Sequence, residues 1–282
     1  MMPPTSREPK GARPAVAASW QHSGVIPPTP AFFVQPHYDD VALSCGATAA
    51  AFAAAGQSPH IVTVFASEIV DAMVGDFAAA KHERWGLREP DEVLVRRRDE
   101  DRAAAAILGC TLRWLGLPDA IYRGDRYVSD QHLYGELHAD EAALADHLAE
   151  ELLHLPEWRP RTAVFVPIGI GAHVDHQLVF EAGRCLARRG VTVWAYEDTP
   201  YAIHSPDAAQ RRLEQVREWV DDPQANRVDA FMDTKLAAVA CYASQVPVIF
   251  RFTGDFRAAL TDHARGVADG AGLAERFWRI RG

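Results

Sequence analysis

The sequence predicts an α/β fold with a mainly parallel β-sheet. Short apolar runs, rich in β-branched and aromatic residues, alternate along the chain with longer alanine-rich or amphipathic stretches. Such alternation is typical of parallel strands joined by crossover helices. The chain has 282 residues, of which 48% are hydrophobic, and this is enough apolar material to bury one core. We therefore expect a single domain over residues 31–282.

The expected strands are apolar runs that end in a turn signal or a polar cluster: residues 31–35, 60–66, 111–115, 162–167 and 191–196. Helices are expected where alanine accumulates or apolar residues recur at helical spacing: residues 41–55, a charged helix that includes 96–102, and residues 140–155, 177–188, 207–219, 233–243 and 256–281. Residues 67–92 lack such a period and follow the second strand. We expect this long segment to border the site and to cover part of a substrate.

Composition narrows the class of protein. Residues 1–30 carry seven prolines among small and polar residues, without the apolar core of a secretory signal, and we expect a flexible proline-rich arm there. The formal net charge of −9 argues against a nucleic-acid-binding surface. No apolar run is long enough to span a bilayer. With four cysteines that lack paired spacing, these features favour a cytoplasmic protein.

A first polar cluster follows the strand at residues 31–35. His37, Asp39 and Asp40 lie in the turn between this strand and the helix expected at 41–55. In parallel α/β sheets, ligands bind beyond the carboxyl ends of the strands. A histidine nitrogen and two carboxylates are metal ligands or proton acceptors in such a place. The alternative is structural, because an aspartate before a helix is also a common N-cap.

A second polar cluster follows the strand at residues 162–167. His173 and His176 are three residues apart at the expected start of a helix, so both can face one centre. Asp175 lies between them and could orient one of the imidazole rings. The two clusters occupy equivalent places in the predicted fold, and a parallel sheet can bring them together.

Two histidines and one carboxylate around an open position are typical of a catalytic metal site. We expect His37, Asp40 and His176 to be the ligands. Asp39 would then be the general base for the attacking water, and His173 would stabilise the oxyanion or protonate the leaving group. Zinc is the expected metal, although Fe(II), Co(II) and Mn(II) suit the same ligands.

The two clusters resemble motifs of the PIG-L or LmbE-like zinc-dependent N-acetylglucosaminyl deacetylases. Their first motif, His-x-Asp-Asp, matches residues 37–40, and their second, His-x-Asp-His, matches residues 173–176. Residues 97–109 and 235–245 resemble two further segments of that family. The resemblance covers residues 32–245 and implies a Rossmann-like three-layer sandwich. It also implies an activity, namely hydrolysis of an N-acetylglucosamine-type acetamide to acetate and a free amine.

The sequence departs from the family pattern at three positions. Tyr38 and Val41 replace the proline and the glutamate that often occur there, and neither change removes an expected ligand. Gly171 stands where some members have a tyrosine that helps to bind the oxyanion. If a phenol acts in this protein, it comes from elsewhere, and Tyr122, Tyr196 and Tyr201 are the candidates.

Four residues are candidate substrate contacts. Trp85 could stack on a sugar or simply fill a surface groove, and Arg97 could bind hydroxyls or a phosphate if its helix start faces the site. Glu197 and Asp198 follow the strand at 191–196 and could either bind sugar hydroxyls or form a turn before Pro200.

Two alternatives to a sugar deacetylase remain open at this stage. One is an amidase that acts on a thiol-sugar conjugate, and the other is a non-catalytic sugar-binding protein of the same fold. The presence of Asp39 beside the expected ligands argues against the second, because a binding protein needs no general base. The expected partner is a small amino-sugar substrate. Homo-oligomers are compatible with the sequence, which specifies neither the sugar nor the oligomeric state.

Overall fold

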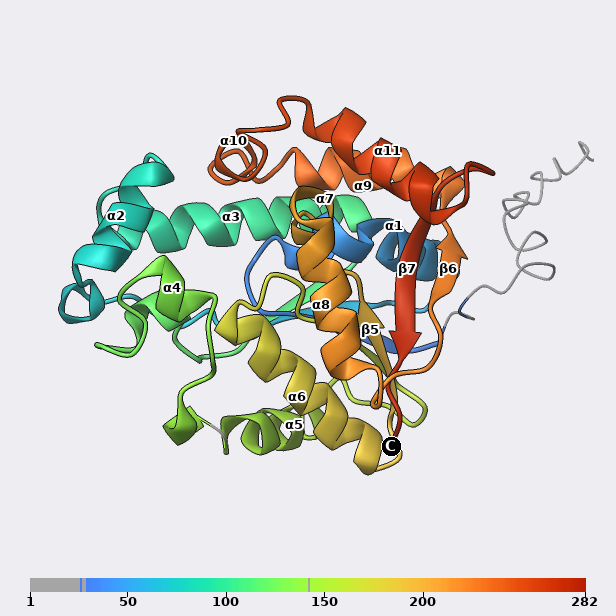
Figure 1. The fold of residues 1–282 in the computed structure, drawn as a ribbon, viewed down its shortest axis with the longest axis horizontal. Coiled ribbons are helices and arrows are strands. Elements are labelled where there is room, and N and C mark those ends of the chain that lie inside the picture. Colours follow the sequence, from blue (N-terminus) through green and yellow to red (C-terminus); the bar gives the residue numbers. More distant parts are fainter. Residues whose placement is uncertain (1–25, 27–28, 142) are drawn as a thin grey trace, which may run out of the picture.

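A computed structural model describes residues 26, 29–141 and 143–282 (Figure 1). Its centre is a sheet of seven strands in the order β3-β2-β1-β4-β5-β7-β6. The strands are β1 (Ala31–Gln35), β2 (His60–Thr63), β3 (Thr111–Trp114), β4 (Ala163–Pro167), β5 (Thr192–Tyr196), β6 (Gln224–Arg227) and β7 (Ala274–Arg279). The first five pair in parallel, and the last two add an antiparallel edge. The α/β prediction with a mainly parallel sheet is confirmed.

Helices lie against both faces of this sheet (Figure 1). The helices are α1 (Asp40–Ala54), α2 (Asp76–Arg84), α3 (Pro90–Leu108), α4 (Asp130–Leu133), α5 (Leu144–Leu153), α6 (Val174–Arg188), α7 (Tyr201–His204), α8 (Pro206–Val216), α9 (Met232–Val239), α10 (Val246–Ile249) and α11 (Phe256–Val267). Successive strand residues point to opposite faces. Phe33 therefore packs in the cluster under α1, α3, α9 and α11, whereas Phe32 and Val34 pack in the cluster under α5, α6 and α8.

The strand order places the two polar clusters side by side. β1 pairs with β4 in register, with Phe33 opposite Phe165, and the chain order of the strands reverses between them. Such a reversal opens a crevice at the carboxyl ends of the strands. The turn from β1 into α1 and the loop from β4 into α6 both end at this crevice.

Helix α1 is kinked at Cys45, where φ is −135° and ψ is 24°. The kink frees backbone groups that a regular helix would pair. Glu275 of β7 accepts hydrogen bonds from the backbone N–H groups of Ala47 and Thr48, at 3.1 and 2.8 Å. Lys235 of α9 donates to the carbonyl oxygen of Ser44 at 3.1 Å and to Glu275 at 2.8 Å. A buried ion pair therefore stabilises the break in the helix.

The structure corrects the expected elements in three places. Residues 256–281 are not one helix, because α11 ends at Val267 and β7 follows as an inner strand of the sheet. Phe277 and Trp278 are buried as expected, but from a strand that packs on both faces. The irregular segment at 67–92 contains α2, and the helix expected at 140–155 begins only at Leu144. β6 was not predicted, since its sequence is short and polar.

Two further expectations concern the N-terminal arm and membrane-spanning segments. The proline-rich arm at 1–30 lies almost wholly outside the described residues, apart from positions 26, 29 and 30. Across the described part of the chain, no helix combines the length and the apolar character needed to cross a membrane.

Candidate active site

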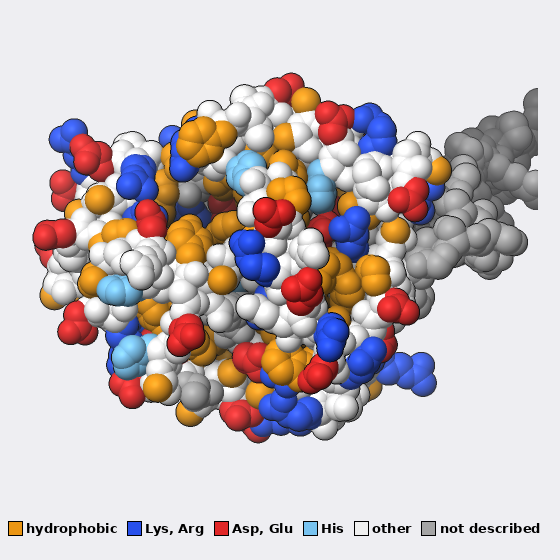
Figure 2. Space-filling model, viewed as in Figure 1, with side chains coloured by type: hydrophobic (Ala, Val, Ile, Leu, Met, Phe, Trp, Pro, Cys, Tyr) orange, Lys and Arg blue, Asp and Glu red, His pale blue; other side chains and the backbone are white. Residues whose placement is uncertain are grey.

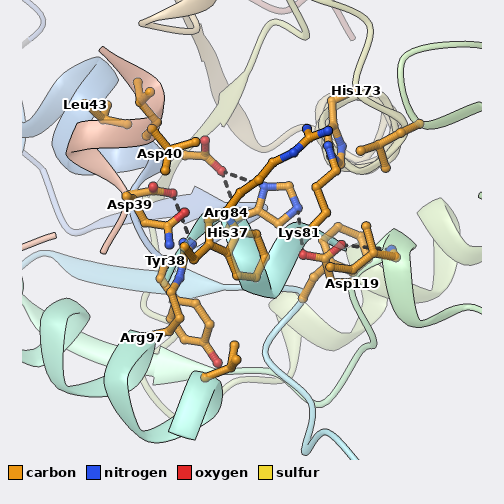
Figure 3. A pocket seen from close by; sticks show the side chains of 18 of the residues that line it. His37, Tyr38, Asp39, Asp40, Leu43, Lys81, Arg84, Arg97, Asp119 and His173 are labelled. Atoms are coloured by element: carbon orange, nitrogen blue, oxygen red, sulfur yellow. Dashed lines mark hydrogen bonds and ion pairs between the residues drawn. The ribbon is translucent and has the colours of Figure 1, made fainter. Parts of the chain in front are cut away.

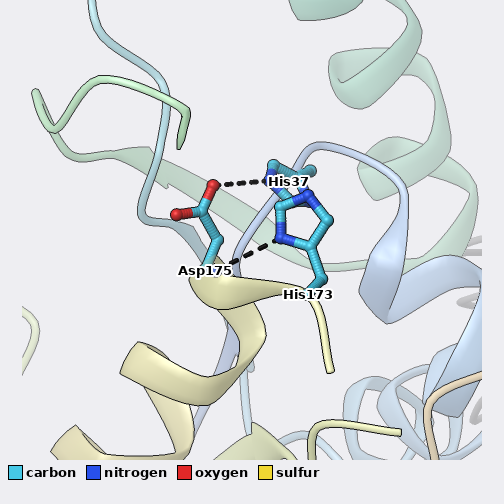
Figure 4. A group of neighbouring side chains, drawn as sticks. All are labelled: His37, His173 and Asp175. Atoms are coloured by element: carbon cyan, nitrogen blue, oxygen red, sulfur yellow. Dashed lines mark hydrogen bonds and ion pairs between the residues drawn. The ribbon is translucent and has the colours of Figure 1, made fainter. Parts of the chain in front are cut away.

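The side chains of the two polar clusters meet at the carboxyl ends of β1 and β4. The ring centroids of His37 and His173 are 4.7 Å apart, and those of His37 and His176 are 5.5 Å apart. Figure 4 shows His37 from the first cluster beside His173 and Asp175 from the start of α6. Ligand atoms of His37, Asp40 and His176 lie within 4.8 Å of one another, and so do those of His37, His173 and Asp175.

The His37, Asp40 and His176 set fits a metal ion. Nδ1 of His37 and Nε2 of His176 each lie 3.5 Å from a carboxylate oxygen of Asp40. Nε2 of His176 is buried and finds no hydrogen-bond partner within the described residues. Its Nδ1 lies 2.6 Å from Oδ1 of Asp198. A carboxylate there favours the proton on Nδ1 and leaves the lone pair of Nε2 for a ligand bond.

The His37, His173 and Asp175 set fits a metal less well. Asp175 already accepts hydrogen bonds from Arg123 and from the backbone N–H of Ala120, the latter at 3.1 Å. It also lies 3.0 Å from Nε2 of His37. We infer that Asp175 orients His37, so that Nδ1 of the ring faces Asp40.

Negative charge is concentrated around His37. Burial by itself would lower the pKa of His37, but the carboxylates of Asp119, Asp175 and Asp40 outweigh it and raise that pKa well above its ordinary value. Burial would raise the pKa of Asp40, yet His176 and His37 hold it below its usual range. A buried cluster with this many carboxylates is the environment that a divalent cation stabilises.

Asp39 faces the cavity and does not act as a helix cap. It occupies the N-cap position of α1, but its side chain makes no capping hydrogen bond. Oδ1 of Asp39 lies 3.5 Å from Nη2 of Arg97. Burial raises the pKa of Asp39, and the Arg97 guanidinium partly offsets that rise. The side chain of Asp39 therefore does not cap the helix, which was the structural alternative to a catalytic role.

His173 caps the start of α6 with its ring. Its Nδ1 accepts a hydrogen bond from the backbone N–H of Asp175 at 3.2 Å. Nδ1 is then unprotonated, and a neutral ring carries its proton on Nε2. Burial, with the neighbouring His37, lowers the pKa of His173 well below its ordinary value. The geometry thus supports a neutral hydrogen-bond donor at this position instead of an imidazolium.

A cavity of about 490 Å³ lies over this centre. Figure 3 shows His37, Asp39, Asp40 and His173 around one part of it and Arg97 below them. In the surface view it is the hollow below α10, with hydrophobic side chains along its edge (Figure 2). Ligand pockets usually measure roughly 300–1,000 Å³, so the space exceeds what an acetyl group alone requires.

Comparison with known proteins agrees with this geometry. Residues 32–187, more than half of the chain, match the family PIG-L, described as GlcNAc-PI de-N-acetylase. The chain belongs to the PIG-L family. A 2′-N-acetylparomamine deacetylase of Niallia circulans is 29% identical over 236 residues, which are 77% of this chain and 81% of that protein. A 2′-N-acetylparomamine deacetylase of Streptomyces fradiae is 31% identical over 221 residues, 75% of this chain and 72% of that protein.

A solved structure extends the match to most of the chain. The zinc-inhibited form of teicoplanin deacetylase Orf2 superposes with a TM-score of 0.75 and 26% identity. The match covers 89% of this chain and 97% of the other. These three relatives of the PIG-L chain are deacetylases, and the predicted family is confirmed.

Not all expected substrate contacts of this PIG-L chain reach the cavity. Trp85 and Arg97 line it, and the Arg97 guanidinium lies 5.5 Å from the centroid of the Trp85 ring. Glu197 and Asp198 do not line it. Glu197 pairs with Arg276 and His263, and Asp198 holds His176 and accepts the backbone N–H groups of Gly169 and Ile170. Of the two readings of these acids, the structural one fits their contacts, because their oxygens are bound within the protein and neither residue lines this cavity.

The space left by Gly171 is filled by Tyr201. A Cβ atom on Gly171, whose φ is +88°, would come within 2.7 Å of the Tyr201 ring. Tyr201 lines the cavity and packs edge-on against His176, with ring centroids 5.6 Å apart. Tyr196 points away and donates to the carbonyl oxygen of Val34 at 3.1 Å. Tyr122 lines the cavity, but its hydroxyl is bound to His82 at 2.6 Å.

Sequence reasoning missed several members of the site. Asp119 follows β3 and lies 3.5 Å from Nε2 of His37. A carboxylate just beyond a strand end was the signal used for Asp40, and it could have found Asp119. Arg123, which holds Asp175, and Tyr134, which lines the cavity beside His173, lie in the segment 121–137, whose polar and aromatic composition fits a sugar-binding wall but has no ligand spacing.

Proposed function

We propose that this protein is a metal-dependent hydrolase that removes the N-acetyl group from an N-acetylglucosamine-type sugar conjugate. The products are acetate and a free amine. The observation that carries the proposal is Nε2 of His176, a buried nitrogen without a partner in the described structure, which faces Asp40 and His37 beneath a sugar-sized cavity. The deacetylase relatives support the choice of reaction.

His37, Asp40 and His176 would hold the metal. Bound there, it would polarise the acetamide carbonyl and lower the pKa of the attacking water. We propose zinc, with Fe(II), Co(II) and Mn(II) as alternatives for the same donors. The related teicoplanin deacetylase has been described in a zinc-inhibited form, so we expect activity to depend on the amount of zinc as well as on its presence.

The chain's own residues would move the protons. Asp39 would accept a proton from the attacking water, because its carboxylate faces the cavity without a capping bond. Arg97, 3.5 Å from Asp39, would keep that carboxylate ionised and aimed at the water. The proton held on Asp39 would then pass to the departing amine, so that the base returns to its starting state.

The oxyanion would be stabilised by hydrogen bonds from His173 and Tyr201. His173 would donate from Nε2, since its Nδ1 accepts from the backbone. Tyr201 would supply the phenol that the sequence leaves open at Gly171, because its ring fills the space beside that glycine. Such donors stabilise the charge that develops on the oxygen in the transition state and thereby raise the rate of reaction.

The proposal is tested by metal analysis of the purified protein together with acetate release from a panel of N-acetylglucosaminides. We expect about one equivalent of a divalent metal per chain, with acetate release that a chelator abolishes and that sub-stoichiometric to equimolar metal restores. Absence of bound metal, even after each of the four candidate ions is supplied, would refute the metal site.

The same assay separates the two alternatives. An amidase for thiol-sugar conjugates would release its acyl group from a thiol-bearing glycoside but not from simple N-acetylglucosaminides. A sugar-binding protein would bind the glycosides without releasing acetate at any metal concentration. The orientation of Asp39 toward the cavity, without a capping bond to α1, favours catalysis over simple binding.

A further inference from the structure

The outer part of the cavity carries positive charge. Lys81 and Arg84 of α2 and Arg251, two residues after α10, line it, together with the single carboxylate of Asp130 from α4. Figure 3 shows Lys81 and Arg84 over the same space that His37 and His173 border. The formal net charge of the whole chain is −9, so this local excess of cations is opposite in sign to the rest of the protein.

Arg84 and Arg251 are at most weakly paired with carboxylates of the described residues. Asp130 is bound by Lys81, with 2.6 Å between Nζ and Oδ1, while Nη1 of Arg84 is 4.0 Å from the same carboxylate. Arg251 donates to the carbonyl oxygen of Val248 at 3.0 Å and lies over the ring of Phe252. Among the described residues, no carboxylate lies within ion-pair distance of Arg251.

The wall between this rim and the metal-binding residues is apolar. Ile69, Val93, Leu94, Ile121 and Leu133 line the cavity, and all five are buried in one cluster. This cluster is separate from the two that cover the sheet, and most of its residues come from α2, the start of α3 and the segment 120–133. The part of a substrate that extends outward from the sugar therefore contacts apolar side chains first and the guanidinium groups of the rim beyond them.

We propose that the substrate is a sugar conjugate whose aglycone is apolar and carries a negative charge, and that Arg84 and Arg251 bind this charge. The inference rests on the proposed function, which places the sugar at the centre. Arginine binds carboxylate and phosphate groups through paired N–H donors. A substrate with a cationic aglycone would face like charges at the rim and would be disfavoured.

The test is a set of four N-acetyl-β-D-glucosaminides that differ only in the aglycone: methyl, phenyl, 4-carboxyphenyl and 4-(aminomethyl)phenyl. We expect kcat/KM to rise from methyl to phenyl and again to 4-carboxyphenyl, and to fall for the aminomethyl compound. Because the rim is partly exposed, we expect roughly a tenfold ratio between the two charged aglycones, equivalent to about 1.4 kcal/mol. The ratio should shrink as salt is added.

Variants assign the effect to named residues. In Arg84→Gln and Arg251→Gln the ratio should fall, mainly through KM, and in the double variant it should approach one. The methyl glycoside should be hydrolysed as in the unchanged protein. Arg88→Gln is the matched control, since Arg88 is an exposed arginine nearby that does not line the cavity, and it should leave the ratio unchanged.

Two readouts keep this inference separate from the proposed function. Acetate release from all four glycosides at similar rates, with no effect of the arginine variants, would overturn the inference and leave the deacetylase standing. No acetate release from any glycoside would refute the proposed function. In that case the dissociation constants of the two charged glycosides, measured by calorimetry with the unchanged and double-variant proteins, still decide the inference. Equal affinities, or no binding, would refute it.

Discussion

At the scale of single residues, the site depends on which atom of each side chain is free. Asp39 and Asp40 are adjacent in sequence but have different partners, because consecutive side chains at a helix start point in different directions. Oδ2 of Asp40 accepts the backbone N–H of His37 at 2.8 Å, whereas Asp39 faces Arg97 and the cavity. His176 likewise has one nitrogen bound by Asp198 and the other unpartnered among the described residues.

The first prediction concerns Asp39. Asp39→Asn keeps the size and the packing of the side chain but removes its ability to accept a proton. We expect kcat to fall by roughly 10²–10⁴-fold, the usual contribution of a general base, while metal content and thermal stability stay close to those of the unchanged protein. Acetate release and elemental analysis on the same sample measure both. Activity near the unchanged level would exclude Asp39 as the base.

The second prediction concerns His176 and the carboxylate behind it. His176→Ala should lose the metal, because it removes a proposed ligand. Asp198→Asn should weaken metal binding by about 10–100-fold without abolishing it, since outer hydrogen bonds orient the ligand ring. A competition titration with a chromogenic chelator measures both affinities. Full metal occupancy in His176→Ala would remove that residue from the ligand set.

At the scale of elements, the break in α1 needs partners from the far end of the chain. Glu275 and Lys235 satisfy the groups freed at Cys45, and both side chains are almost fully buried. Gly46, next to the kink, lowers the local helix propensity, but the alanine-rich composition of the segment favours a regular helix and outweighs this signal in a prediction from sequence. The same contacts hold the last strand against α1.

The third prediction tests this ion pair. Lys235→Met should lower the free energy of unfolding by roughly 3–5 kcal/mol, because it leaves the buried Glu275 carboxylate without its counter-charge. Adding Glu275→Gln should restore part of the loss, since the amide oxygen still accepts a backbone N–H while the unpaired charge is gone. Urea unfolding of the two single variants and the double variant measures the coupling. Additive losses would show that the two side chains act independently.

At the scale of the whole molecule, Asp101 joins the helical layer on one face to three strands. Its carboxylate accepts hydrogen bonds from Gln35, Thr63 and Trp114, which belong to or border β1, β2 and β3, and from Tyr242 beyond α9. Burial raises the pKa of Asp101 to about 6, although these donors oppose the shift. The folded protein therefore keeps Asp101 protonated up to a higher pH than the unfolded chain does, and the carboxylate is ionised above about pH 6.

The fourth prediction follows from the sign of that shift. The folded pKa lies above the ordinary value of 3.8, so between these two pH values the folded protein binds a proton that the unfolded chain has released. Stability from this group therefore falls as pH rises from about 4 to about 6 and is constant above that range. Asp101→Asn should remove this pH dependence. Between pH 4 and about 6 the unchanged protein should lose stability relative to Asp101→Asn. Unfolding free energies of both proteins, measured from pH 4 to 7.5, should show this relative loss. A difference that does not vary with pH would contradict the raised pKa.

The sequence by itself determined the features that depend on neighbouring residues. Strands β1 to β5, the alternation with helices and the two His-Asp clusters at strand ends could be predicted, because local periodicity and short motifs encode them. The PIG-L family followed from the same motifs. Only the tertiary structure decided which side chains complete the site, since Asp119, Asp198 and Tyr201 reach His37, His176 and Gly171 from other segments. The inner strand β7 and the edge strand β6 were likewise decided by pairing with distant segments. β7 pairs with β5 and β6, and the short polar β6 gains its hydrogen bonds only once β7 is in place.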